Sequence, residues 1–228
     1  MNYRIKSPET EMKAVVQLPS SKSICNRALI LNALSYSPYP IQNLSDCDDT
    51  AVLVKALNSN DRDFDIQAAG TAMRFLTAFL AKVVGEWTIT GTERMKNRPI
   101  KILVDALMRL ELVLNTWKKK VFLRYVFGVV ALQGGEIFLS GGVSSQYISA
   151  LLMVAPLMEK GLVLHLEGNI TSKPYIQLTL QLMKQFGVQS EWKGSTIRVA
   201  PQEYQPIPFT VESDWSAASY WYEMMALS

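Results

Sequence analysis

Short apolar stretches that are typical of β-strands alternate along the chain with longer stretches that are typical of helices. In the first of these helices, Ile24, Ala28 and Leu31 stand at positions i, i+4 and i+7 and form one apolar stripe. The alternation recurs at intervals of roughly 60 residues, which is too long for a small solenoid repeat. We therefore predict a layered domain in which helices pack on sheets.

The pattern predicts helices over residues 20–34, 46–57, 72–84, 100–110, 144–158, 174–186 and 216–226. It predicts strands over residues 12–18, 65–67, 87–90, 134–139, 162–166, 195–199 and 209–211. His165 lies in the apolar strand 162–166, where we expect its ring to be a hydrogen-bonded structural group.

The composition excludes several classes of protein. With 228 residues, 49% of them hydrophobic and 19% charged, the chain is neither disordered nor collagen-like nor a coiled coil. A net charge of +3 is too balanced to indicate a nucleic-acid partner. Two cysteines and one histidine provide neither a disulfide framework nor a histidine-rich metal site or Ser-His-Asp triad.

The first residues are polar and charged, unlike a secretory signal, and no apolar run reaches the roughly 18 residues that a membrane span needs. We therefore expect a cytoplasmic protein with reduced thiols and no membrane partner.

Hydroxyl groups gather at four predicted helix starts, in the segments 21–23, 70–71, 144–146 and 171–173. One interpretation is that they are ordinary N-caps, for which serine and threonine are preferred. The other is an anion site, because a helix N-terminus has unpaired N–H groups and a partial positive charge.

Basic residues favour the second interpretation. Ser23 and Arg27 share one helix face, as do Thr71 and Arg74, and the segments 20–27 and 70–82 contain no acidic residue. Neither G-x-x-x-x-G-K-[ST] nor G-x-G-x-x-G occurs, so a standard nucleotide loop is excluded. The sequence thus predicts a site for a strongly anionic small molecule that carries phosphate or carboxylate groups.

Six ordered motifs carry a family resemblance. They are LPSSKSICNRAL at 18–29, AGTAMR at 69–74, GTERM at 91–95 with RPI at 98–100, SSQY at 144–147, SKPYI at 172–176 and VESDWS at 211–216. The series resembles the signatures of 5-enolpyruvylshikimate-3-phosphate synthase and extends from about Leu18 to Tyr220.

The resemblance implies transfer of the enolpyruvyl group of phosphoenolpyruvate to the 5-hydroxyl of shikimate 3-phosphate, with release of phosphate and without a metal or organic cofactor. By position, Lys22 would be the catalytic residue of this chain and would contact both substrates. Gly70, Thr71 and Arg74 would bind substrate, Gly70 and Arg74 on the phosphoenolpyruvate side. The residues implied for shikimate 3-phosphate are Ser23, Arg27, Ser144, Ser145, Gln146, Ser172 and Tyr175.

The fold that the resemblance implies is α+β, an enolpyruvyl transferase-type lobe of three βαβαββ units with helix N-termini facing a cleft. Residues 14–213 would form this N-terminal lobe, 1–13 a strand of the C-terminal lobe, and 214–228 the start of that lobe. The family's general acid/base carboxylates lie largely in the other half, so we expect this chain to need a C-terminal lobe for activity.

The segment 111–127 departs from the family, which has Pro-Pro-Leu-Arg there with an arginine for phosphoenolpyruvate. Permitted codons read in another frame give a family-like segment with arginine in place of Val126, so two compensating frame errors are one hypothesis. Real divergence, with Arg124 as a displaced substitute, is the other.

Two further readings of function stay open. One is a lobe that binds shikimate 3-phosphate without catalysis, and the other is a related enolpyruvyl transferase that acts on UDP-N-acetylglucosamine. The Ser-Ser-Gln and Lys-Pro-Tyr matches favour the shikimate enzyme over the second.

Overall fold

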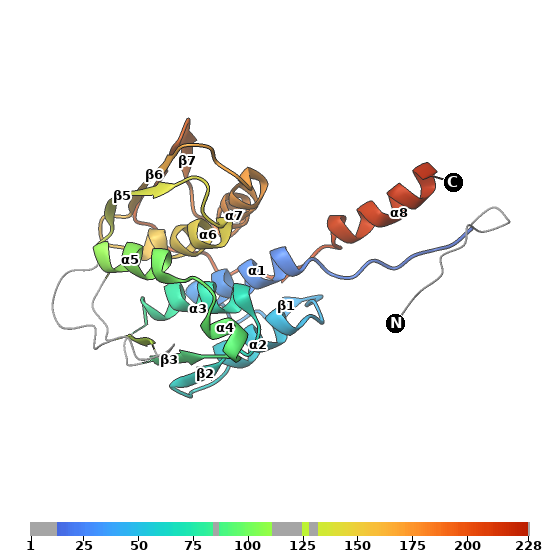
Figure 1. Ribbon diagram of the computed structural model, residues 1–228, viewed down its shortest axis with the longest axis horizontal. Helices are drawn as coiled ribbons and strands as arrows, with labels where there is room; N and C mark the ends of the chain where they lie inside the picture. The colour runs from blue at the N-terminus through green and yellow to red at the C-terminus, as the bar shows by residue number, and fades with distance from the viewer. Residues whose placement is uncertain (1–12, 84–86, 111–124, 128–131, 228) are drawn as a thin grey trace.

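The structure is a computed structural model that describes residues 13–83, 87–110, 125–127 and 132–227 (Figure 1). Its helices are α1 Lys22–Leu34, α2 Asp48–Leu57, α3 Gly70–Leu80, α4 Glu93–Lys96, α5 Lys101–Arg109, α6 Ser145–Val154 with the 3₁₀ turn η1 Ala155–Leu157, α7 Lys173–Gln185 and α8 Trp215–Leu227. Its strands are β1 Ile41–Gln42, β2 Asp63–Asp65, β3 Trp87–Thr90, β4 Tyr125–Phe127, β5 Gly135–Ser140, β6 Leu162–Glu167, β7 Glu191–Lys193, β8 Thr196–Val199 and β9 Phe209–Thr210.

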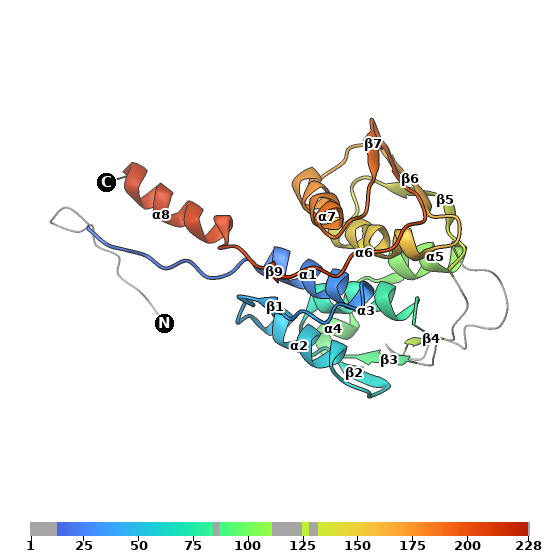
Figure 2. The ribbon, with the colours of Figure 1, turned by 180° about the vertical axis from the view of Figure 1, so that it is seen from behind.

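Two sheets lie on opposite sides of a central layer of helices, as Figures 1 and 2 show from two directions. One sheet has the order β5-β6-β8-β7, with β5 and β6 parallel and the other pairs antiparallel. The other has the order β2-β3-β4, and a parallel pair joins β1 to β9. The elements from β5 to β8 form one complete βαβαββ unit, and the mixed architecture agrees with the α+β lobe implied above.

Helices α3 and α6 lie in the centre and are buried on nearly all sides. Every residue of α3 except Phe79 is buried, and so is every residue of α6 except Gln146. Polar side chains on such enclosed helices need hydrogen-bond partners inside the protein, as Arg74 and Thr77 of α3 and Ser149 of α6 have. In the described part of the chain, no helix is long and apolar enough to cross a membrane.

The chain enters and leaves the lobe at one place. Ser20 and Ser213 form an antiparallel bridge, Ser21 N–H donates to the carbonyl of Glu212 at 2.9 Å, and Asp214 N–H donates to that of Pro19 at 2.8 Å. Beyond this point α8 projects away from the lobe (Figures 1 and 2). The proposed boundaries at 13/14 and 213/214 stay predictions.

Several predicted boundaries are wrong, each for a local reason. The part of the 12–18 strand that the structure describes has no neighbouring strand to pair with, and Val15 is fully exposed. Strand β2 ends before Gln67, whose φ of 50° is incompatible with an extended strand. Helix α6 gives way to a 3₁₀ turn at Pro156, which lacks the N–H that a continuing helix needs.

Short elements escaped prediction, namely β1, β4, β7 and α4. The His165 ring is hydrogen-bonded, as expected. It contacts Glu136 and Thr196 and stacks on Phe138, all in the β5-β6-β8-β7 sheet.

Candidate functional site

The N-terminal ends of α1, α3, α6 and α7 meet around one cavity of about 300 Å³. The convergence of four hydroxyl-marked helix starts, expected from the sequence, is therefore present. Of the predicted substrate residues, all except Gly70 and Arg74 line the cavity, together with one residue that was not predicted, Asn26. The lining residues are Lys22, Ser23, Asn26, Arg27, Thr71, Ser144, Ser145, Gln146, Ser172 and Tyr175.

Ordinary N-capping accounts for only one of these helix starts. Ser144 caps α6, since its hydroxyl accepts a hydrogen bond from Gln146 N–H at 3.4 Å. Ser21 and Ser172 hold the N-cap positions of α1 and α7, but their side chains make no capping bond. The first N–H groups of α1 thus remain without a side-chain acceptor, which is the arrangement that an anion site requires. Helix α7 offers fewer donors, because Pro174 has no N–H and Tyr175 N–H already donates to the carbonyl of Ser172.

Ser172 adopts the left-handed conformation, with φ 53° and ψ 31°. This conformation is unfavourable for a residue with a side chain, and such residues cluster at functional sites. It turns the chain sharply at the start of α7, whose first turn brings Tyr175 to the cavity.

Arg27 is the buried cation of the site. Its Nε donates to Thr179 Oγ1 at 2.7 Å, its Nη2 to Ser149 Oγ at 3.1 Å and its Nη1 to the carbonyl of Ser23 at 2.8 Å. Burial lowers the pKa of Arg27 to about 10, so the guanidinium is still protonated at neutral pH. No carboxylate among the described residues bonds to it, so a buried positive charge faces the cavity without a negative partner.

The two hydroxyls that hold Arg27 have defined hydrogen-bond directions. A guanidinium has only donors, so both Ser149 and Thr179 must accept from it. Thr179 donates its own proton to the carbonyl of Tyr175 at 2.9 Å, which leaves Ser149 as the donor in their mutual 2.8 Å contact. This network joins α1, α6 and α7 through a single charged group.

Substituting Thr179→Val should destabilise the chain by about 1.5–3 kcal/mol, because a buried charge loses an acceptor that valine cannot replace. Thr77→Val is the matched control, since Thr77 is equally buried but bonds only to the carbonyl of Met73, an uncharged group. It should cost less than about 1 kcal/mol. Urea unfolding of both variants measures the difference, and equal losses would contradict the assigned role of Thr179.

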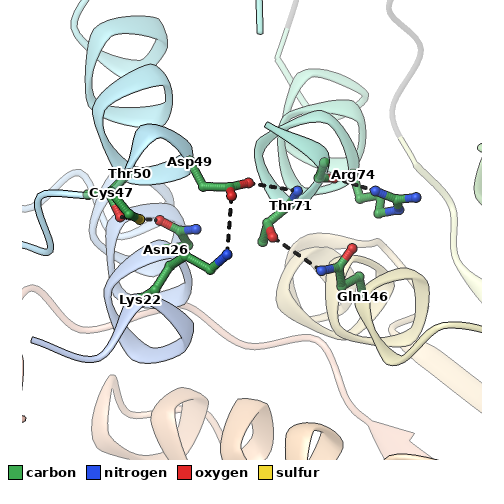
Figure 3. A network of polar contacts seen from close by, with 9 residues as sticks. Lys22, Asn26, Cys47, Asp49, Thr50, Thr71, Arg74 and Gln146 are labelled. Atoms are coloured by element: carbon green, nitrogen blue, oxygen red, sulfur yellow. Dashed lines mark hydrogen bonds and ion pairs between the residues drawn. The ribbon is translucent and has the colours of Figure 1, made fainter. Parts of the chain in front are cut away.

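A carboxylate from α2 completes the site, as Figure 3 shows. Asp49 Oδ2 forms an ion pair with Lys22 Nζ at 3.2 Å, and Asp49 Oδ1 accepts from Thr71 N–H at 3.0 Å. Gln146 Nε2 in turn donates to Thr71 Oγ1 at 3.1 Å. Asp49 therefore caps α3 from outside and holds the Lys22 ammonium at the cavity.

Sequence reasoning missed Asp49 as a site residue. A carboxylate in the first turn of a helix is explained by the dipole of that helix, and Asp49 lies outside the acid-free segments 20–27 and 70–82 that pointed to the site. The signal in the sequence was a pair of adjacent acids, Asp48 and Asp49, because one carboxylate already balances the positive end of a helix dipole.

Arg74 and Arg98 form a second basic cluster against Gly70, beside the cavity. Arg74 Nη1 donates to the carbonyl of Gly70 at 2.6 Å, and its guanidinium lies 5.3 Å from the centre of the Tyr147 ring. A Cβ atom on Gly70 would stand 2.3 Å from Nη1 of Arg98 and 2.8 Å from Nη1 of Arg74. Glycine is therefore required for two guanidinium groups to lie against the first turn of α3.

Two predictions fall on the segment 111–127. Arg124 lies outside the described residues, and so does most of the segment for which a frame error is one hypothesis. Val126 lies in β4, where it pairs with Thr88 of β3. Within the described residues, no group of three histidine, cysteine, aspartate or glutamate side chains could hold a metal ion.

Comparison with known proteins agrees with the motifs. The sequence profile of EPSP synthase (3-phosphoshikimate 1-carboxyvinyltransferase) matches residues 6–62 and 54–228. A 3-phosphoshikimate 1-carboxyvinyltransferase of Bacteroides fragilis is 55% identical over 229 residues, which cover all of this chain and 56% of the relative. One from Tolumonas auensis is 36% identical over 96% of this chain and 58% of its own length.

The fold is also that of a solved structure. EPSP synthase from Acinetobacter baumannii superposes with a TM-score of 0.76 at 16% identity, over 90% of this chain and 51% of that protein. The chain spans about half the length of the curated relatives that it matches. A profile that matches nearly the whole chain, on a shared fold, establishes that the chain belongs to the EPSP synthase (3-phosphoshikimate 1-carboxyvinyltransferase) family.

Proposed function

We propose that the cavity binds shikimate 3-phosphate, and that the chain carries this half of an enzyme that transfers the enolpyruvyl group of phosphoenolpyruvate to it. The observation that carries the proposal is the buried Arg27 guanidinium, which faces a hydroxyl-lined cavity and has no carboxylate partner in the described structure. A dianionic phosphate with hydroxyls on a small ring fits this combination of charge and hydrogen-bonding groups.

The chemistry follows from the two substrates. The 5-hydroxyl adds to C2 of phosphoenolpyruvate while C3 is protonated, and the tetrahedral intermediate then eliminates phosphate. Lys22, held at the cavity edge by Asp49, supplies positive charge to both anionic substrates. Serine hydroxyls and Gln146 orient the acceptor, whereas Arg74 and Arg98, whose guanidinium groups lie against Gly70, provide the positive charge for phosphoenolpyruvate. We place the reaction in the cytoplasm and assign it no cofactor.

Calorimetric titration of the 228-residue chain with shikimate 3-phosphate tests the proposal. We expect saturable binding, and we expect UDP-N-acetylglucosamine to give no heat of binding at the same concentrations. Binding of the UDP-sugar in place of shikimate 3-phosphate would identify the chain as the related transferase. Absence of shikimate 3-phosphate binding by a folded chain would overturn the proposal.

A further inference from the structure

Asn26 is a cavity residue whose side chain is only half satisfied. It is completely buried, yet it lines the cavity between Lys22 and Arg27. Its Oδ1 accepts a hydrogen bond from Thr50 Oγ1 at 2.8 Å. Its Nδ2 has no acceptor in the described part of the chain. Buried amide donors are nearly always paired, so this one calls for an explanation.

Thr50 of α2 contacts the amide oxygen of Asn26 on the side away from the cavity. Thr50 is itself buried and lies 3.3 Å, Oγ1 to Sγ, from Cys47. Because Thr50 donates its proton to Asn26, the Cys47 thiol is the donor in that contact. In this arrangement the amide oxygen lies toward α2. In Figure 3 the amide nitrogen points to the opposite side, toward the space that Lys22, Asp49 and Thr71 border.

We propose that Asn26 is a further substrate-binding residue, and that its Nδ2 donates a hydrogen bond to an oxygen of shikimate 3-phosphate. The inference rests on the proposed function, which supplies the ligand. A buried donor without an acceptor is unfavourable, and an oxygen of the ligand would supply that acceptor. Asn26 thus adds a neutral donor between the two cations of α1, which suits a hydroxyl or phosphate oxygen rather than another cation.

Binding of shikimate 3-phosphate to the 228-residue chain tests the proposal by calorimetry. Asn26→Ala should raise the dissociation constant roughly tenfold, as expected for the loss of one hydrogen bond. Asn26→Asp, which puts a carboxylate oxygen where the donor stands, should weaken binding more than alanine does. If the ligand instead donates to this residue, Asn26→Asp keeps the affinity, and the proposal is wrong.

Asn32→Ala is the matched control. Asn32 also lies in α1, also has one buried unpaired amide atom, and bonds through Nδ2 to the carbonyl of Tyr39. It does not line the cavity, so its removal should leave the dissociation constant unchanged. Equal effects of Asn26→Ala and Asn32→Ala would assign both amides a purely structural role and overturn the proposal.

A measurement on the unsubstituted chain does not depend on how the variants fold. In ¹⁵N NMR spectra, shikimate 3-phosphate should shift the Asn26 side-chain amide signals and slow their exchange with water, while those of Asn32 stay in place. Unchanged Asn26 signals in a chain that does bind the ligand would reject this inference and leave the proposed function intact. A folded chain that binds no shikimate 3-phosphate would overturn both.

Discussion

Incubated by itself with phosphoenolpyruvate and shikimate 3-phosphate, the 228-residue chain should release no phosphate. Catalysis requires groups that stabilise the transition state more than the ground state. By family resemblance, the carboxylates for the general acid/base steps lie in the half that these residues do not include. Each such step typically contributes about 10² to 10⁴ in rate, so the combined loss of these steps should leave no turnover that the assay detects.

The geometry of the cavity leads to the same expectation. The Lys22 side chain, which would contact both substrates, is 47% exposed. Orienting two substrates and excluding water requires walls on both sides of them, and this lobe provides one.

A phosphate-release assay with the purified chain, alone and with a separately expressed C-terminal lobe of the Bacteroides fragilis relative, measures this effect. We expect activity only in the mixture, and none in a mixture that contains the Arg27→Ala variant. Turnover by the chain alone, at a rate that follows its concentration and is absent from the Arg27→Ala preparation, would contradict the prediction.

Replacing Arg27 should cause the largest loss of affinity of any single substitution in the cavity. A hydrogen bond to a charged group contributes about 1.5–3 kcal/mol, so Arg27→Ala should weaken shikimate 3-phosphate binding by about 10- to 100-fold. Three of its five N–H donors hold the protein together, which leaves the other two for a ligand. The substitution also removes the charge that Ser149 and Thr179 are arranged to hold.

Two comparisons separate binding from folding in that experiment. Arg198→Ala removes an exposed arginine from β8 and should change neither affinity nor stability. Thr179→Val removes an acceptor of the Arg27 guanidinium but keeps its charge. It should therefore lower stability while retaining more affinity for shikimate 3-phosphate than Arg27→Ala does. An Arg27→Ala chain that folds and binds with the affinity of the unsubstituted chain would exclude Arg27 as a ligand.

The parts of the site that could be predicted are those whose residues lie together in the first turn of one helix. The segments at Lys22, Thr71, Ser144 and Ser172 each combine a hydroxyl with an N-terminus, and the order of the motifs implied that they meet. Their meeting at one cavity follows from the packing of α1 and α6 against both α3 and α7.

The parts that could not be predicted depend on contacts between distant segments. Asp49 reaches Lys22 and Thr71 across 27 and 22 positions of sequence, and no local pattern encodes such pairs. The same holds for Thr179, which lies 152 positions from the arginine it holds. The predicted ends of strands were wrong for a related reason. A strand exists only where a neighbouring strand supplies its hydrogen bonds.

The bridge between Ser20 and Ser213 makes the body of the lobe a nearly closed loop of polypeptide. Because its two ends are already held by backbone hydrogen bonds, joining them with a hairpin turn of about two residues should cost little loop-closure entropy. New termini could then be opened in an exposed turn elsewhere, as in other circular permutations. The same geometry suits insertion of the lobe into a host loop whose two ends lie as close together as neighbouring strands.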